Sequence, residues 1–126
     1  MIEKKWKSIF VIHPIYLDEM KIDEIKEEAR RCVEKAYDIK DTSIIDINTD
    51  DFKDLSGNKL YDGIYILTRI VDLLWISEVA YFPEGWENDD NSKIIHYICE
   101  TCKFPYIHVK DGNISYHLFN KKENAK

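Results

Sequence analysis

The order of apolar segments along the chain is the feature that most restricts its fold. Short apolar runs alternate with longer stretches in which apolar residues recur every three or four positions, the spacing of a helix that buries one stripe. The expected strands are Ser8 to His13, Thr42 to Ile47, Val79 to Pro83, Pro105 to Val109 and Ile114 to Phe119, and the expected helices are Asp18 to Tyr37, Leu60 to Ile76 and Ser92 to Lys103. The order β-α-β-α-β-α-β-β predicts a parallel sheet with helices on both faces.

This pattern predicts one three-layer α/β/α domain of the flavodoxin or Rossmann type. We expect four parallel strands in the order 2-1-3-4. The pair Asp111-Gly112 predicts a reverse turn, after which the last strand folds back antiparallel at the edge. A chain of 126 residues, 44% of them hydrophobic, is the size of a single domain with one core. We treat residues 1–126 as that domain and expect residues 120–126 to be a frayed tail.

Charge and composition exclude several classes of protein. The formal net charge of −6 argues against binding to nucleic acid polymers, which requires a basic face. The sequence contains no apolar run of about 18 residues and no signal-peptide core, so we expect a cytoplasmic protein that is not inserted in a membrane. The three cysteines are an odd number in such a protein, which predicts reduced thiols instead of a disulfide framework.

Polar residues follow the expected strands at the edge where α/β sheets bind ligands. In such sheets the binding crevice lies beyond the carboxyl ends of the strands. His13, Pro14 and Tyr16 follow the first strand, Asn48 follows the second, and the loop 84–88 follows the third. The third helix begins beside this loop, and its free N–H groups and positive dipole end could hold an anion such as a phosphate. The pattern indicates a small-molecule site.

Two segments of the chain are similar to a known family. They are Ser8-Ile9-Phe10-Val11-Ile12-His13-Pro14 and the stretch from Ser77 through Ile107, which contains the loop Gly85-Trp86-Glu87-Asn88. Together they resemble the nucleoside 2-deoxyribosyltransferase superfamily, and most closely its short, uncharacterised branch found largely in bacteria and their phages. The Gly-Trp-Glu-Asn loop is the specific part of the match.

The resemblance implies a fold and a pocket for a nucleoside or nucleotide, but not the reaction. Family members cleave the bond between base and sugar with a glutamate nucleophile, which a first-strand tyrosine orients. Here that tyrosine corresponds to Phe10 and the glutamate to Ile95, and neither side chain can do this chemistry. His96 matches a histidine common in the short branch. The expected ligand-binding residues are His13, Pro14, Tyr16, Asn48, Gly85, Trp86, Glu87, Asn88, Ile95 and His96.

We expect no cofactor and no metal. His96, Cys99 and Cys102 are spaced three apart on one helix, but they drift around it and do not supply the four ligands that zinc requires. Trp86 could stack on a nucleobase, plug its loop onto the core or form a dimer contact. His108 and His117 lie in strand patterns and are expected to be sheet-face residues.

Three hypotheses of function follow. The first is a catalytically inactive protein that binds a nucleoside, a nucleotide or a nucleotide-derived signal molecule. The second is an active N-glycosidase or deoxyribosyltransferase that uses Glu87 or a neighbouring acid as its carboxylate. The third is a phage-type protein-interaction or anti-defence module, in which Phe10, His13 and Ile95 fill the former active site and the acidic helix from Asp18 to Asp38 contacts a partner. The family resemblance and the short, aromatic-rich chain also suggest a homodimer.

Overall fold

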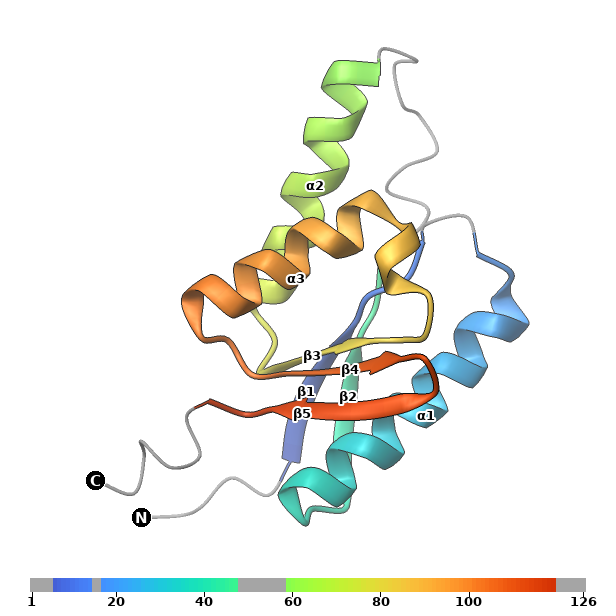
Figure 1. The fold of residues 1–126 in the computed structure, drawn as a ribbon, viewed down its shortest axis with the longest axis vertical. Helices are drawn as coiled ribbons and strands as arrows, with labels where there is room; N and C mark the ends of the chain where they lie inside the picture. Colours follow the sequence, from blue (N-terminus) through green and yellow to red (C-terminus); the bar gives the residue numbers. More distant parts are fainter. Residues whose placement is uncertain (1–5, 15–16, 48–58, 120–126) are drawn as a thin grey trace.

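The chain folds into an α/β structure in which a five-stranded sheet is combined with three α-helices (Figure 1). The computed structural model describes residues 6–14, 17–47 and 59–119. The elements are β1 (Trp6–Val11), α1 (Glu19–Tyr37), β2 (Asp41–Ile45), α2 (Lys59–Trp75), β3 (Val79–Phe82), the short 3-10 helix η2 (Trp86–Asn88), α3 (Asp90–Cys102), β4 (Tyr106–Lys110) and β5 (Asn113–His117). Within this part of the chain, no helix is both long enough and apolar enough to cross a membrane.

The strand order of the sheet is β2-β1-β3-β4-β5. The first four strands are parallel, and β5 is antiparallel to β4. This confirms the order expected from the sequence and the antiparallel strand at the edge. The hairpin between β4 and β5 turns at Asp111 and Gly112, which both have positive φ, 53° and 78°. Glycine reaches such angles without strain, which explains the turn position.

Strand β1 is an interior strand of the sheet, between β2 and β3, and separates two groups of buried side chains. Ile9 and Val11 pack in a cluster with residues of α1, including Val33. Phe10 and Ile12 belong to a second cluster, which contains residues of α2 and α3. Since side chains alternate across a strand, burial on both sides requires a continuous apolar run. Such a run is what the sequence shows between positions 9 and 12.

The connection from β3 to α3 depends on the backbone turn at Gly85 and on the side chain of Glu84. Gly85 has a φ of 90°, a left-handed conformation that favours glycine and lets the chain turn after Pro83. The Glu84 carboxylate accepts hydrogen bonds from the backbone N–H groups of Asp111 (3.0 Å) and Gly112 (2.7 Å). The loop is therefore tied to the β4–β5 turn.

Asp89 starts α3 as its N-cap. Its carboxylate accepts hydrogen bonds from the backbone N–H of Ser92 (3.1 Å) and from the Ser92 hydroxyl (2.7 Å). Asp90, the next residue, only forms a surface ion pair with Lys93, at 3.3 Å. The two neighbouring aspartates thus have different structural roles, although their sequence context is nearly the same.

We expect Asp89→Ala to lower the free energy of unfolding by about 1 kcal/mol, because an N-cap hydrogen bond is lost. Asp90→Ala is the matched control and should change it by less than about 0.5 kcal/mol, since an exposed ion pair contributes little. Urea denaturation of both variants measures the difference. Equal effects of the two substitutions would contradict the cap assignment.

Candidate functional site

His13 is the central residue of the candidate site. It follows β1, where the Ile12 N–H still continues the sheet by donating to the Tyr81 carbonyl at 3.0 Å. Only 2% of His13 is exposed. Its Nδ1 lies 2.8 Å from the backbone carbonyl oxygen of Pro14. A carbonyl oxygen can only accept, so Nδ1 carries the proton of this hydrogen bond.

The other ring nitrogen of His13 is free to bind a ligand. Nε2 is buried, and no described residue provides it with a hydrogen-bond partner. With the proton on Nδ1, Nε2 of the neutral ring carries a lone pair and acts as an acceptor. A buried acceptor without a partner costs free energy, and a ligand that donates a hydrogen bond would recover it. This nitrogen therefore favours a ligand with an N–H or O–H group.

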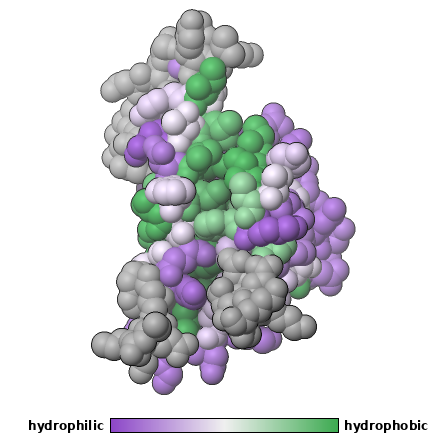
Figure 2. Space-filling view, turned by 90° about the vertical axis from the view of Figure 1, so that its left-hand side faces the viewer, coloured by the Kyte–Doolittle hydropathy of each residue, from purple (hydrophilic) through white to green (hydrophobic). Residues whose placement is uncertain are grey.

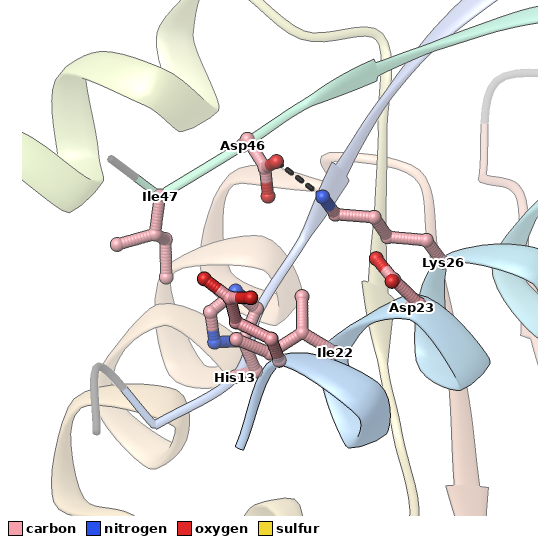
Figure 3. Close-up of a pocket in the computed structure, with 7 residues that line it drawn as sticks. His13, Ile22, Asp23, Lys26, Asp46 and Ile47 are labelled. Atoms are coloured by element: carbon pink, nitrogen blue, oxygen red, sulfur yellow. Dashed lines mark hydrogen bonds and ion pairs between the residues drawn. The ribbon is translucent and has the colours of Figure 1, made fainter. Parts of the chain in front are cut away.

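Two pockets meet at His13. The larger, of about 440 Å³, lies at the carboxyl end of β1 and the start of α3. It is lined by His13, Pro14, Ile70, Asn88, Asp89, Asp90 and Asn91. The smaller, of about 250 Å³, is bounded by the first turns of α1 and the residues that follow β2 (Figure 3). It is lined by His13, Glu19, Ile22, Asp23, Lys26, Asp46 and Ile47. Both pockets lie at the edge of the sheet where the sequence predicted a site.

The pockets are acidic. Asp89 and Asp90 line the larger one. The smaller one has three carboxylates and a single ammonium group, that of Lys26. The Lys26 ammonium already forms a salt bridge with Asp46 (Figure 3). Negative charge at this density repels anions and favours neutral or cationic ligands.

The structure brings together only some of the residues expected to bind a ligand. His13, Pro14 and Asn88 line the larger pocket. Ile95 lines neither pocket: it is fully buried and belongs to the same cluster as Phe10. The predicted ligand-binding residues Tyr16 and Asn48 lie outside the described residues.

Three further predicted residues, from the loop and α3, face a different part of the molecule. Trp86, Glu87 and His96 are absent from the lining of both pockets. The Glu87 carboxylate forms an ion pair with Lys110 on β4, at 3.6 Å. Gly85 turns the backbone before η2. The Gly85-Trp86-Glu87-Asn88 loop therefore contributes one side chain, that of Asn88, to the larger pocket.

Trp86 stacks on a pair of histidines instead of facing the pockets. Its ring centroid is 4.0 Å from that of His96 and 5.5 Å from that of His108, with interplanar angles of 11° and 23°. The two imidazole centroids are only 5.2 Å apart, and His96 Nε2 lies 3.0 Å from His108 Nδ1. Both imidazoles must therefore lie over the same face of the indole, because a sandwich would separate them much further. Trp86 thereby anchors the loop 84–88 to α3 and β4.

The histidine pair belongs to a larger group of rings, to which β4 and β5 contribute. Tyr106 is paired with His117 in the sheet register, and their rings stack at 4.5 Å. The Tyr106 hydroxyl donates a hydrogen bond to the Glu100 carboxylate of α3. We name the set Trp86, His96, Tyr106, His108 and His117 the ring cluster. Among the described residues, no group of three or more His, Cys, Asp or Glu side chains is arranged to hold a metal ion.

The ring cluster was not predicted, although the sequence contained a signal for it. Alternation in a strand places Tyr106 and His108 on one face, and a hairpin turning at Asp111 and Gly112 pairs Tyr106 with His117. His108 and His117 were expected on a sheet face, and they lie there. The contact with His96 and Trp86 depends on how α3 and η2 pack over that face. Strand patterns carry no information about this packing.

The surroundings of His96 and His108 in the ring cluster favour their neutral forms. Burial, followed by the nearby His108 imidazole, lowers the pKa of His96 to about 4, against the opposing effect of Glu100. Burial also lowers the pKa of His108, and His117 and Lys110 act in the same direction. A neutral pair can share one proton between the two facing nitrogens, whereas two imidazolium rings cannot. His96 and His108 are therefore favoured in their uncharged forms at neutral pH.

We expect the stability of the protein to fall as the pH drops from 6.5 to about 4. In this window the unfolded His96 takes up a proton and the folded one does not, so protonation favours unfolding. After allowance for solvent screening, His96 should contribute a loss on the order of 1–2 kcal/mol. Urea denaturation at several pH values measures this loss.

His96→Phe should reduce this pH dependence while keeping a ring on Trp86, and Tyr97→Phe on the exposed side of α3 serves as the matched control. An unchanged slope in His96→Phe would contradict the neutral state of His96.

No family model, curated protein or solved structure matches this chain.

Proposed function

We propose that this protein binds a nucleoside in the pockets around His13 and does not cleave it. The unpartnered Nε2 of His13, buried where the two pockets meet, is the observation that carries this proposal. The volume of the larger pocket, about 440 Å³, is within the range of small-molecule sites. The ligand class comes from the resemblance to nucleoside 2-deoxyribosyltransferases in the first strand and the Gly85-Trp86-Glu87-Asn88 loop.

The chemistry of the site fits a nucleoside. A sugar hydroxyl or an exocyclic amino group would donate to His13 Nε2, and the side-chain amide of Asn88 can both donate and accept. Ile70 supplies apolar surface to the larger pocket. Such a combination of a few polar groups with apolar wall is typical of small-molecule sites.

The charge of the site favours an unphosphorylated ligand. Asp89 and Asp90 are in the larger pocket, and Glu19, Asp23 and Asp46 are in the smaller one. A 5′-phosphate would be placed among these carboxylates, with Lys26 held by Asp46. We therefore propose nucleosides, and not nucleotides, as the preferred ligands.

The surroundings of two carboxylates and the residues at the family's catalytic positions support the proposal that the protein does not transfer glycosyl groups. Phe10 and Ile95, which correspond to the tyrosine and the glutamate of the family, are fully buried in one cluster. Glu87, the alternative nucleophile, is paired with Lys110, and Asp89 is occupied in capping α3. A nucleophilic carboxylate must reach the anomeric carbon. Glu87 lines neither pocket, and Asp89, although it lines the larger pocket, is held by its hydrogen bonds to Ser92.

The finer description of the fold belongs to the same proposal. We place the chain in the nucleoside 2-deoxyribosyltransferase-like group, with its helices arranged in a three-layer, flavodoxin- or Rossmann-like α/β/α architecture. Two observations support this: the strand order β2-β1-β3-β4-β5, and the separate clusters formed with α1 and with α2 and α3.

Isothermal titration calorimetry should detect saturable binding of at least one nucleoside from a panel of ribo- and deoxyribonucleosides. The matching 5′-monophosphate should bind at least about tenfold more weakly, because of the carboxylates. If no nucleoside binds, the proposed function is wrong. If only the monophosphates bind, the pocket still takes a ligand with a base and a sugar, but the proposed preference for unphosphorylated ligands is wrong.

Two variants test the site itself. His13→Phe removes the acceptor and should abolish detectable binding. Asn88→Ala, at an exposed position, should weaken binding by about three- to tenfold through the loss of one hydrogen bond. Asn113→Ala at the β4–β5 turn is the matched control and should bind like the wild type. Equal affinity of Asn88→Ala and Asn113→Ala would remove Asn88 from the site.

Incubation of the wild type with each nucleoside should release no free base, as measured by liquid chromatography. Release would show that the protein is an enzyme. In that case Glu87→Gln should abolish the release if Glu87 is the nucleophile, whereas Asp90→Asn serves as the comparison within the larger pocket.

A further inference from the structure

Helix α2 is apolar on two opposite faces. Its inner face packs into the core through Ile70 and Leu74, which are 1% and 5% exposed. Its outer face carries Ile64, Tyr65, Val71 and Trp75, and Ile76 directly follows the helix; all five are exposed. Exposed apolar side chains gathered on one part of a surface are typical of an interaction site. The outer face of α2, defined by these five residues, is therefore expected to have a partner.

The outer face of α2 is extensive. Trp75 is 85% exposed, and Ile64 and Ile76 are 57% and 59% exposed. Figure 2 views the side of the molecule on which α2 and α3 lie in Figure 1, and it shows hydrophobic surface gathered at its centre. The five side chains offer on the order of 500 Å² of apolar surface, a large part of the ~800 Å² that each partner contributes to a stable interface.

The pattern of the outer face is symmetric about its middle. Ile64 and Tyr65 lie at one end, and Trp75 and Ile76 lie at the other. Arg69 and Asp72, one cation and one anion, lie between them in the sequence and form an ion pair within the helix, at 3.6 Å. A twofold interface requires a surface complementary to itself, in which residue i of one copy meets residue j of the other and the reverse.

We propose that the outer face of α2 binds the same face of a second copy of this chain, with the two helices antiparallel across a twofold axis. An axis near Ile70 and Val71 brings Arg69 of each copy opposite Asp72 of the other. It also brings the Ile64–Tyr65 end of each helix against the Trp75–Ile76 end of the other. Apolar contacts at both ends then enclose two complementary charge pairs. This inference does not depend on the identity of the ligand.

Sedimentation equilibrium over a concentration series should show a monomer–dimer equilibrium for the wild type. Trp75→Glu should weaken the dimer at least about tenfold, because it places a charge in an apolar contact. Met20→Glu on α1 is the matched control: Met20 is 73% exposed, and its helix packs in the other cluster. It should leave the equilibrium unchanged. Circular dichroism verifies that both variants fold.

A charge exchange tests the antiparallel orientation. Arg69→Glu makes the central pairs between the two copies negative, and Asp72→Arg makes them positive, so each variant alone should dimerise at least about tenfold more weakly. In a heterodimer of the two variants, the introduced glutamate of one copy faces the introduced arginine of the other, and the native Asp72 faces the native Arg69. An equal mixture should therefore form heterodimers with nearly wild-type affinity. Pairs within one helix cannot produce this recovery.

The outcomes separate the proposal from its alternatives. A wild type that is monomeric at all concentrations would overturn it, as would a Trp75→Glu variant that dimerises normally. Disruption by Trp75→Glu without recovery in the mixture would overturn the antiparallel arrangement. Recovery in the mixture, together with loss in Trp75→Glu, is the result we expect.

Discussion

Burial of β1 on both faces is the constraint on which the rest of this structure depends. The strand pairs with β2 on one side and β3 on the other, and Ile9, Phe10 and Val11 are completely buried. Its alternating side chains contribute to two separate clusters, which contain residues of α1 and of α2 and α3. A shift of β1 by one residue would turn the side chains of each cluster toward the opposite face of the sheet. Because both clusters contain side chains of β1, its register is fixed.

The same constraint creates the candidate site. Burial continues past the end of β1 to His13, so a polar ring is carried into the interior at the edge of the sheet. Nδ1 of His13 forms a hydrogen bond with the Pro14 carbonyl oxygen, whereas Nε2 has no hydrogen-bond partner among the described residues. Ligand sites often contain a polar group whose partner is supplied by the ligand. The acidic residues around it then restrict the charge of what can bind.

The loop that carries the family resemblance has a structural task beside any role in binding. Gly85 turns the chain, Glu84 holds the β4–β5 turn, and Trp86 stacks on His96 and His108. Only Asn88 from this motif lines a pocket. In this structure, therefore, the loop joins η2, α3 and the edge of the sheet.

The sequence by itself determined the order of the elements and of the strands. Periodicity of apolar residues separates strands from helices, and short right-handed connections leave few possible arrangements of a β-α-β-α-β-α-β-β chain. It also located the carboxyl edge of the sheet and His13 within it. Only the tertiary structure decided the direction in which each side chain at this edge points. Trp86 and His96 turn toward His108, Glu87 toward Lys110, and Ile95 into the core. These choices depend on contacts between segments distant in the chain, about which local patterns carry no information.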